Sequence, residues 1–254
     1  MSDVNVKEEE IEEAELLSAQ RKFDLSLVLL REMLSRARND QTRMRILFDI
    51  VTCSTWLDLN EVPDKAIQEL KQYPDYEVSH AFIVMVQTEA FIEFGRAQEA
   101  LDLITEGLRL KLLQREDFQD WKYEYLHLEG RSLTRLARCE EALNAFNNAH
   151  AMDPAGKHEI DMLIARSNCL LALSRYEEAY DTARQVLTRG DDEMATLAMQ
   201  YMAECRMWQS RIPEALELYT AIQKRLPCSL VQEERIETGT KNAMAYLEKN
   251  SPKF

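Results

Sequence analysis

The feature that most constrains this chain is an internal repeat. One copy is anchored at Ala142, inside the run Arg138–Leu143. Gly130 precedes this anchor by twelve residues, and Phe146 and Pro154 follow it by four and twelve residues. Self-similarity at a fixed period is the sequence signature of a repeat architecture. The chain is therefore expected to build its core from stacked copies of one small unit.

Six copies of this frame follow one another along the chain. Their anchors are Ser26, Ala66, Ala100, Ala142, Ala179 and Ala215, spaced by 40, 34, 42, 37 and 36 residues. A small residue stands twelve positions before every anchor: Ala14, Ser54, Thr88, Gly130, Ser167 and Ala203. A basic residue stands four positions before the anchor in five copies: Lys22, Arg96, Arg138, Arg175 and Arg211. Small residues at a fixed offset let two helices approach closely, so each copy is predicted to contain a packed helix pair.

The apolar residues of each copy recur at spacings of three and four, which predicts two amphipathic helices. In the fourth copy we expect these helices over residues 121–136 and 139–152. Only 6 Gly and 6 Pro occur in 254 residues, and this scarcity of turn-forming residues excludes a Gly-rich all-β fold. One helix pair cannot bury its apolar faces alone, so the copies are expected to stack on one another.

This succession of residues resembles the tetratricopeptide repeat (TPR). The resemblance is clearest in the copies anchored at Ala142 and Ala215. It implies an all-α fold: a right-handed α-solenoid of about six TPR-like helix-turn-helix repeats over residues 1–228. Residues 229–254 are expected to form a C-terminal capping helix, over about 229–248, and a short tail, because the last repeat needs a polar outer face.

Charge and cysteine content limit the partners and the compartment. The 31 basic and 45 acidic residues give a net charge of −14, which opposes binding to nucleic acid and to anionic membranes. The longest apolar run, Ala81–Val86, is far shorter than the ~20 residues of a membrane span. The five Cys are widely spaced without a CxxC pair, and the N-terminus is acidic. A cytoplasmic protein with reduced thiols is expected.

No arrangement of residues points to catalysis. The sequence contains no GxGxxG, GxxxxGK[ST], GxSxG or HExxH motif, and its 4 His and 5 Cys lack the spacing of a zinc site. Paired carboxylates such as Glu140–Glu141 are interpreted as solvated charge at a helix N-terminus. We therefore expect a protein that is not an enzyme and that has neither a cofactor nor a metal.

Binding residues are expected where the resemblance places the groove. In TPR-like stacks the first helix of each repeat lines a concave face, on which partners usually lie. The candidate groove residues carried over in this way are Glu89 and Glu93 in the third repeat, His127, Arg131 and Arg135 in the fourth, Asn168 in the fifth, and Met207 and Trp208 in the sixth.

Three of these residues lie four positions apart, so His127, Arg131 and Arg135 share one face of a helix. Because Arg binds carboxylates with two parallel hydrogen bonds, this face would receive an acidic side chain or a C-terminal carboxylate of a partner, with Asn168 adding an amide. The alternative is that the arginines pair with Glu89, Glu93 and Glu124 on adjacent helices. Both interpretations stay open at this stage.

Two charged residues stand where the frame usually places an apolar one. Glu129 and Arg166 lie thirteen residues before the anchors of neighbouring repeats. We expect them to form a partly buried ion pair that fixes the register of the two repeats.

The function predicted from the sequence is that of a non-catalytic adaptor or scaffold, which presents its groove to a peptide or helix of a partner protein. The partner is unidentified, and an acidic segment in it is one option. The alternative is an acidic regulatory protein that occludes a basic partner electrostatically, helped by the charge of −14. Self-association through the first repeat is a further open outcome.

Overall fold

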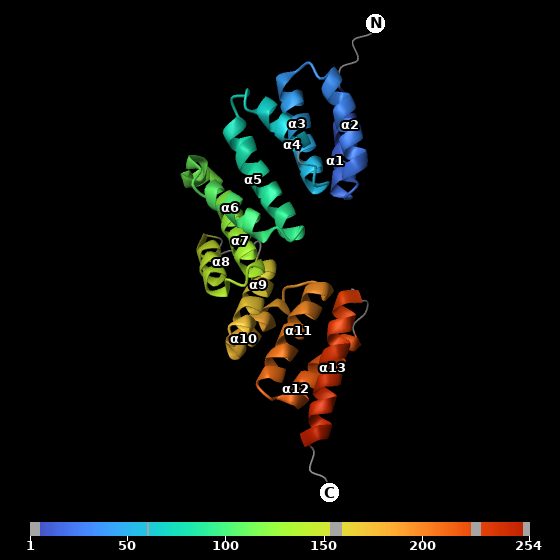
Figure 1. Ribbon diagram of the computed structural model, residues 1–254, viewed down its shortest axis with the longest axis vertical. Coiled ribbons are helices and arrows are strands. Elements are labelled where there is room, and N and C mark those ends of the chain that lie inside the picture. The colour runs from blue at the N-terminus through green and yellow to red at the C-terminus, as the bar shows by residue number, and fades with distance from the viewer. Residues whose placement is uncertain (1–5, 60, 153–158, 225–229, 251–254) are drawn as a thin grey trace. The chain divides into compact units, whose positions relative to one another are not determined.

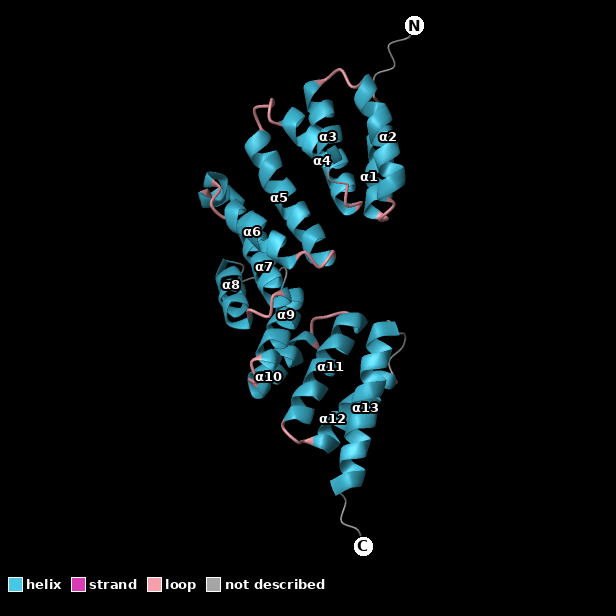
Figure 2. Ribbon diagram, viewed as in Figure 1, coloured by secondary structure: helices cyan, strands magenta, loops and turns pink. Residues whose placement is uncertain are grey.

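The structure, a computed structural model, describes residues 6–59, 61–152, 159–224 and 230–250 (Figure 1). These residues form two compact units, 1–128 and 129–254, and the division falls inside one helix. Within the described ranges the regular structure is helical throughout, as Figure 2 shows. The predicted all-α class is confirmed.

The helices follow one another with short turns. Those of the first unit are α1 Glu8–Ala19, α2 Phe23–Arg36, α3 Asp40–Trp56, α4 Glu61–Leu70, α5 Tyr76–Glu93, α6 Ala97–Gly107 and the start of α7 Gln119–Arg135, preceded by the 3₁₀ helices Lys111–Gln114 and Glu116–Phe118. Those of the second unit are the end of α7, α8 Cys139–Met152, α9 Glu159–Ala172, α10 Tyr176–Val186, α11 Asp192–Trp208, α12 Ile212–Gln223 and α13 Leu230–Asn250. The helices predicted at 121–136 and 139–152 correspond to α7 and α8.

Packing joins these helices into the predicted repeats. In the first unit α1 packs on α2, α3 on α4 and α5 on α6, and the first helices of consecutive pairs, α3 and α5, also touch. The second unit repeats the pattern, with α9 on α10, α11 on α12, and contacts from α9 to α11 and from α11 to α13. The helix-turn-helix repeats expected from the spacing of the anchors are therefore present in each unit.

The anchor and the small residue twelve positions before it are buried in every repeat. In the first repeat, the Ser26 hydroxyl donates to the carbonyl oxygen of Ala14 at 2.8 Å, which joins the two helices where they cross. In the fourth, a Cβ on Gly130 would overlap the ring of Phe146, with Cδ1 at 2.6 Å. The small residues are thus needed because the helices cross almost in backbone contact.

The turn between the two helices of a repeat has one recurring conformation. Five residues, each five positions before an anchor, have positive φ: Arg21, Gly95, Ala137, Ser174 and Ser210. At Ala137 the backbone N–H donates to Thr134, and the next N–H, of Arg138, donates to Leu133 at 2.9 Å. These two bonds form a Schellman motif, which ends the first helix and satisfies its last carbonyl oxygens.

The basic residue four positions before the anchor has a local partner. Arg138 donates two hydrogen bonds to the carboxylate of Glu141, at 2.7 and 2.6 Å. Arg96–Glu99 and Arg175–Glu178 repeat this bidentate geometry, and Arg211 pairs with Glu214. The recurring basic residue therefore stabilises the start of the second helix and is not available as a binding group.

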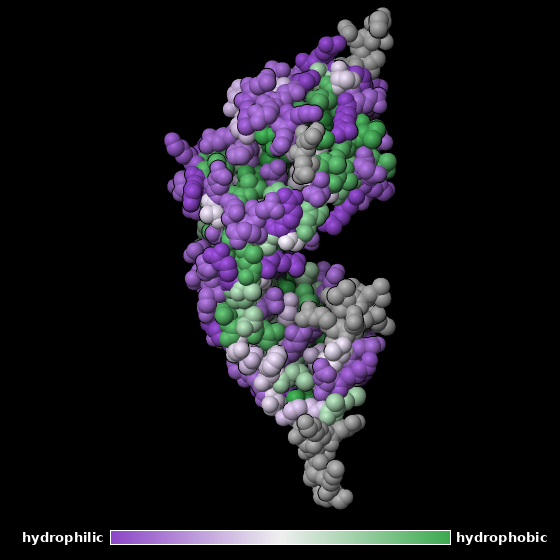
Figure 3. Space-filling model, in the orientation of Figure 1, coloured by the Kyte–Doolittle hydropathy of each residue, from purple (hydrophilic) through white to green (hydrophobic). Residues whose placement is uncertain are grey.

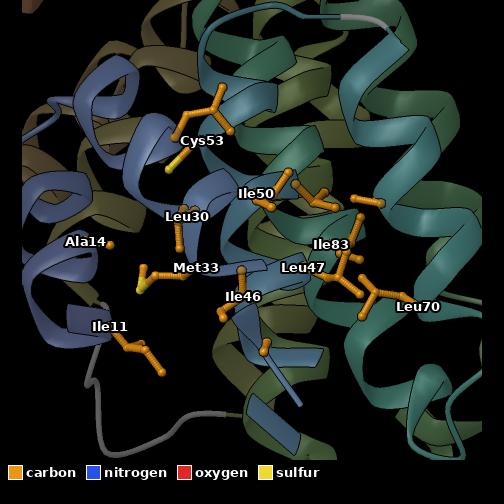
Figure 4. Close-up of a cluster of buried hydrophobic side chains, with 14 residues drawn as sticks. Ile11, Ala14, Leu30, Met33, Ile46, Leu47, Ile50, Cys53, Leu70 and Ile83 are labelled. Atoms are coloured by element: carbon orange, nitrogen blue, oxygen red, sulfur yellow. The ribbon is translucent and has the colours of Figure 1, made fainter. Parts of the chain in front are cut away.

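The apolar core follows the stack of helices. In the first unit one cluster runs from Ile11 on α1 through Leu30 and Ile46 to Ile83 on α5, as Figure 4 shows. In the second unit two clusters lie around Met202 and Tyr219. Cys53 belongs to the first of these clusters. Cys139, Cys169 and Cys205 are also buried, all four are free thiols, and Cys228 lies outside the described residues.

The expected ion pair between Glu129 and Arg166 finds no support among the residues that the structure describes. Burial raises the pKa of Glu129, and the neighbouring charge of Glu141 raises it further. Both effects favour a neutral carboxyl, and neither comes from an arginine, as an ion pair with Arg166 would require.

Candidate functional site

The second unit contains an open pocket between α11 and α13. It has a volume of about 580 Å³ and is lined by Glu204, Met207, Trp208, Tyr219, Thr238, Gly239 and Asn242, a set called the α11–α13 pocket below. The first three residues belong to α11, Tyr219 to α12 and the last three to α13. Two of the residues predicted for the groove, Met207 and Trp208, therefore lie in one pocket.

Trp208 is the most exposed large apolar side chain of the described residues, with 69% of its surface accessible. Its ring lies parallel to that of Tyr176, at the start of α10, with centroids 6.4 Å apart and an interplanar angle of 4°. Trp208 is the last residue of α11, directly before the turn at Ser210. The Trp208 indole thus stacks on Tyr176 while most of its surface stays accessible.

The depth of the pocket depends on Gly239. A Cβ at this position would overlap the ring of Tyr219, whose hydroxyl oxygen would be 2.5 Å away. Tyr219 is 3% exposed and packs with Ile222 and Ile236 in the core beneath. The missing side chain lets α13 lie directly on the tyrosine ring, so the pocket has an aromatic floor.

The pocket is lined by polar side chains from two helices, Glu204 on α11 and Thr238 and Asn242 on α13, and further polar contacts lie beside it on α11. The Gln200 amide donates to the carboxylate of Glu204 at 2.9 Å, one turn from Trp208. Arg206, 6% exposed, has its guanidinium carbon 3.6 Å from the centroid of the Tyr180 ring and donates to Glu177 at 3.0 Å. This hydrogen bond lowers the pKa of Glu177. Arg206 thus fixes the end of α11 against α10, and with it the position of Trp208.

The predicted arginine face is not one open surface. His127 is buried, with 7% of its surface exposed, and its Nδ1 lies 4.0 Å from Glu124. Arg131 is half-buried and Arg135 is exposed. The boundary between the two units falls at Leu128, so His127 belongs to the first unit and both arginines to the second.

Arg135, the last residue of α7, and Asn168, on α9, both belong to the second unit. Both are exposed, and their chain neighbours Thr134 and Cys169 are in contact, with Oγ1 and Sγ 3.2 Å apart. The remaining two predicted residues, Glu89 and Glu93, are exposed on α5 in the first unit. The second unit thus holds Met207 with Trp208 in one pocket, and it also carries the exposed side chains of Arg135 on α7 and Asn168 on α9.

Sequence reasoning missed the part of the pocket that α12 and α13 supply. Tyr219 stands four after its anchor, the place that Phe146 has in the fourth copy, and the sequence analysis did not single it out as a site residue. Gly239 is the one glycine of the last helix. A lone glycine inside a helix is a signal for close packing, but this helix follows the six copies, so the spacing of the anchors does not reveal it.

The described ranges contain neither a metal-binding cluster nor a helix that could span a membrane. No cluster of His, Cys, Asp or Glu there has the arrangement of a metal site. Among the same residues, no helix combines the length and the apolar character needed to cross a bilayer.

Comparison with known proteins gives a likeness in fold alone. The sequence matches no protein-family profile and no curated protein. The crystal structure of the P58(IPK) TPR domain is similar, with a TM-score of 0.47 and 16% sequence identity over 96% of this chain and 80% of that one. The helix pairs and buried anchors described above are the observations that carry the assignment. The fold is TPR-like.

Proposed function

We propose that this protein is a non-catalytic adaptor that binds a peptide or helix of a partner protein in the α11–α13 pocket. The observation that carries the proposal is Trp208, which is 69% exposed and stacks on Tyr176 beside a pocket with an aromatic floor. An ordered, exposed tryptophan at a pocket is the type of residue on which binding energy concentrates. Because this surface is already folded, little conformational entropy is lost in ordering it when a partner binds.

The two groups of the second unit suggest the chemistry of the bound segment. Met207 and Trp208 would take an apolar or aromatic side chain, and Arg135 with Asn168 would take a carboxylate. Helices α9 and α11 are packed neighbours, so their axes lie about 8–10 Å apart. An extended chain rises ~3.3 Å per residue, so an acidic residue about three positions from an apolar one would span from Trp208 on α11 to Asn168 on α9.

Selection from a phage-displayed random peptide library, using the full chain as bait, tests this proposal. Selected peptides are expected to lose about tenfold or more in affinity on Trp208→Ala, since truncating a central aromatic costs about 2 kcal/mol. Phe94→Ala, which removes an exposed aromatic side chain of the first unit, is the matched control and should leave the affinity unchanged. Peptides that bind the Trp208→Ala protein as tightly as the wild type would contradict the proposal.

The Arg135 and Asn168 group has a separate test. Arg131→Glu/Arg135→Glu should weaken peptides that carry an acidic residue and should leave neutral peptides of the same apolar sequence unaffected. Equal loss for both kinds of peptide would show that the arginines support the fold and do not contact the ligand.

The compartment proposed for this adaptor is the cytoplasm. The four described cysteines are free and buried, which suits a reducing environment.

A further inference from the structure

The first repeat departs from the other five on the outer face of its second helix. The residues directly before the anchor and two after it are polar in the later repeats: Lys65, Glu99, Glu141, Glu178 and Glu214, then Gln68, Asp102, Asn144, Asp181 and Glu217. The first repeat has Leu25 and Val28 at these two positions. A face that the architecture leaves to solvent is therefore apolar in this repeat alone.

These side chains are accessible. Leu25 is 52% exposed and Val28 is 64% exposed, both on α2. Leu16, three residues before the end of α1, is 58% exposed, and Leu25 is the third residue of α2, the helix that packs on α1. The three residues are called the N-terminal patch, and Figure 3 shows apolar surface over this helix pair. Large contiguous apolar surface on a soluble protein commonly marks an interaction site.

Acidic side chains border the patch. Glu9, Glu12 and Glu13 lie seven, four and three residues before Leu16, so they share its stripe along α1. All three are exposed, and no ion pair of theirs occurs among the residues that the structure describes. By contrast, Glu10 pairs with Arg36, and Glu8 and Glu15 pair with Arg45. The acids on the side of the patch are thus the ones left without a basic partner.

We propose that the N-terminal patch is the docking surface for a basic amphipathic helix of a partner protein. Leucines of that helix would cover Leu16, Leu25 and Val28, and its Lys or Arg residues would pair with Glu9, Glu12 and Glu13. A second copy of this chain fits less well, because it would bring the same acidic stripe against itself. The patch lies in the first unit and the proposal does not depend on the α11–α13 pocket.

The probe is a fluorescent 18-residue peptide of Lys and Leu, with the leucines at helical positions i, i+3, i+4 and i+7. One comparison peptide has the same composition with the leucines scattered, and another has Glu in place of Lys. The full-length protein is expected to bind the first peptide at least tenfold more tightly than either comparison peptide. Amide hydrogen exchange in α2 should slow on binding.

The decisive variant is Leu25→Glu/Val28→Asp, which installs the residue types that later repeats carry at these positions and should therefore fold normally. It should lower affinity for the Lys/Leu peptide at least tenfold. The matched control is Leu187→Glu/Val78→Asp, which makes the same two changes at side chains that are each 36% exposed elsewhere. The control should stay within twofold of the wild type.

The acidic border has its own variant and control. Glu9→Gln/Glu12→Gln/Glu13→Gln should weaken the peptide at least fivefold at low salt. Glu116→Gln/Glu140→Gln/Glu217→Gln, which removes three exposed carboxylates outside the first helix pair, should change affinity less than twofold.

Three outcomes would overturn the proposal. Equal losses in the decisive and control variants would show attraction to the net charge alone, as would equal binding of the scattered peptide. A wild-type dimer in sedimentation that Leu25→Glu/Val28→Asp dissociates would show that a second copy covers the patch.

Discussion

Single residues in strained backbone conformations hold the turns of this repeat protein. Ala137, Ser174 and Ser210 have φ between 57° and 61°, a region that costs a residue with a Cβ roughly 1–2 kcal/mol. Gly95 occupies the same place in the third repeat without that cost. The strain persists because the Schellman bonds and the packing of both helices fix the turn.

Glycine is therefore expected to stabilise these turns. Ala137→Gly should raise the free energy of unfolding by about 1 kcal/mol, because it removes the steric cost of the positive φ. Ala245→Gly, at an exposed position inside α13, is the matched control and should lower the stability by about 1 kcal/mol. Urea denaturation of both variants measures the difference, and a loss of stability in Ala137→Gly would contradict the prediction.

One buried carboxyl makes stability depend on pH. Burial raises the pKa of Asp49 to about 7, with a further increase from the charge of Glu15 and a decrease from Arg45. Its Oδ2 is buried without a hydrogen-bond partner. The unfolded chain ionises this group at lower pH than the folded one, so the unfolded state is favoured increasingly as pH rises from about 4 to 7.

Asp49→Asn is expected to remove this loss of folding stability at higher pH. The variant should be more stable than the wild type at pH 8, by up to about 4 kcal/mol. The difference should shrink toward pH 4, where the carboxyl of the folded wild type is protonated and carries no more charge than the amide of the variant. Thermal melts of the two proteins across this pH range provide the measurement. A gain in stability that is the same at pH 4 and pH 8 would show that the carboxyl charge is not its cause.

At the scale of elements, the crossing of the two helices in a repeat depends on the residue at the small position. A Cβ on Gly130 would overlap the Phe146 ring, so Gly130→Ala should cost about 1–3 kcal/mol through overpacking. In a Phe146→Leu background the ring is gone, and the same change should become neutral or favourable because Ala is the better helix former. A double-mutant cycle measures this coupling.

The control for this cycle is Gly95→Ala. A Cβ there meets nothing within 4 Å, but its φ of 75° disfavours a side chain. Its cost, about 1 kcal/mol, should not change on Phe146→Leu. If Gly130→Ala costs the same with and without the ring, close packing is not what selects glycine at this crossing.

The sequence predicted these elements well because the repeat encodes them locally. The small residue and the anchor lie on helices that cross within one copy, so their spacing alone identifies the pair. The helices expected at 121–136 and 139–152 are found at Gln119–Arg135 and Cys139–Met152. The segment before α7 forms two short 3₁₀ helices, Lys111–Gln114 and Glu116–Phe118, which the frame of the repeat does not encode.

The candidate site was harder to predict because it forms between the last copy and the helix that follows it. Met207 and Trp208 follow from the position of the groove in one helix, but the floor at Tyr219 depends on how closely α13 approaches. His127 shows the opposite case. Its spacing places it with Arg131 and Arg135, yet its side chain is buried near Tyr123 and Glu124, which no helical periodicity specifies.

For the whole molecule, a net charge of −14 gives the two proposed surfaces opposite responses to salt. Long-range fields act mainly on association rates, and salt screens them. The basic helix proposed for the N-terminal patch is attracted, so its association rate should fall about fivefold or more when NaCl rises from 30 to 300 mM. An acidic peptide entering the α11–α13 pocket approaches against the same field, so its association rate should rise.

Stopped-flow fluorescence of both probes tests this contrast, with a neutral Gln-substituted peptide as the control. Parallel responses of the two charged peptides would mean that the local charges at Arg135 or at Glu9, Glu12 and Glu13 govern the encounter, and not the molecule as a whole.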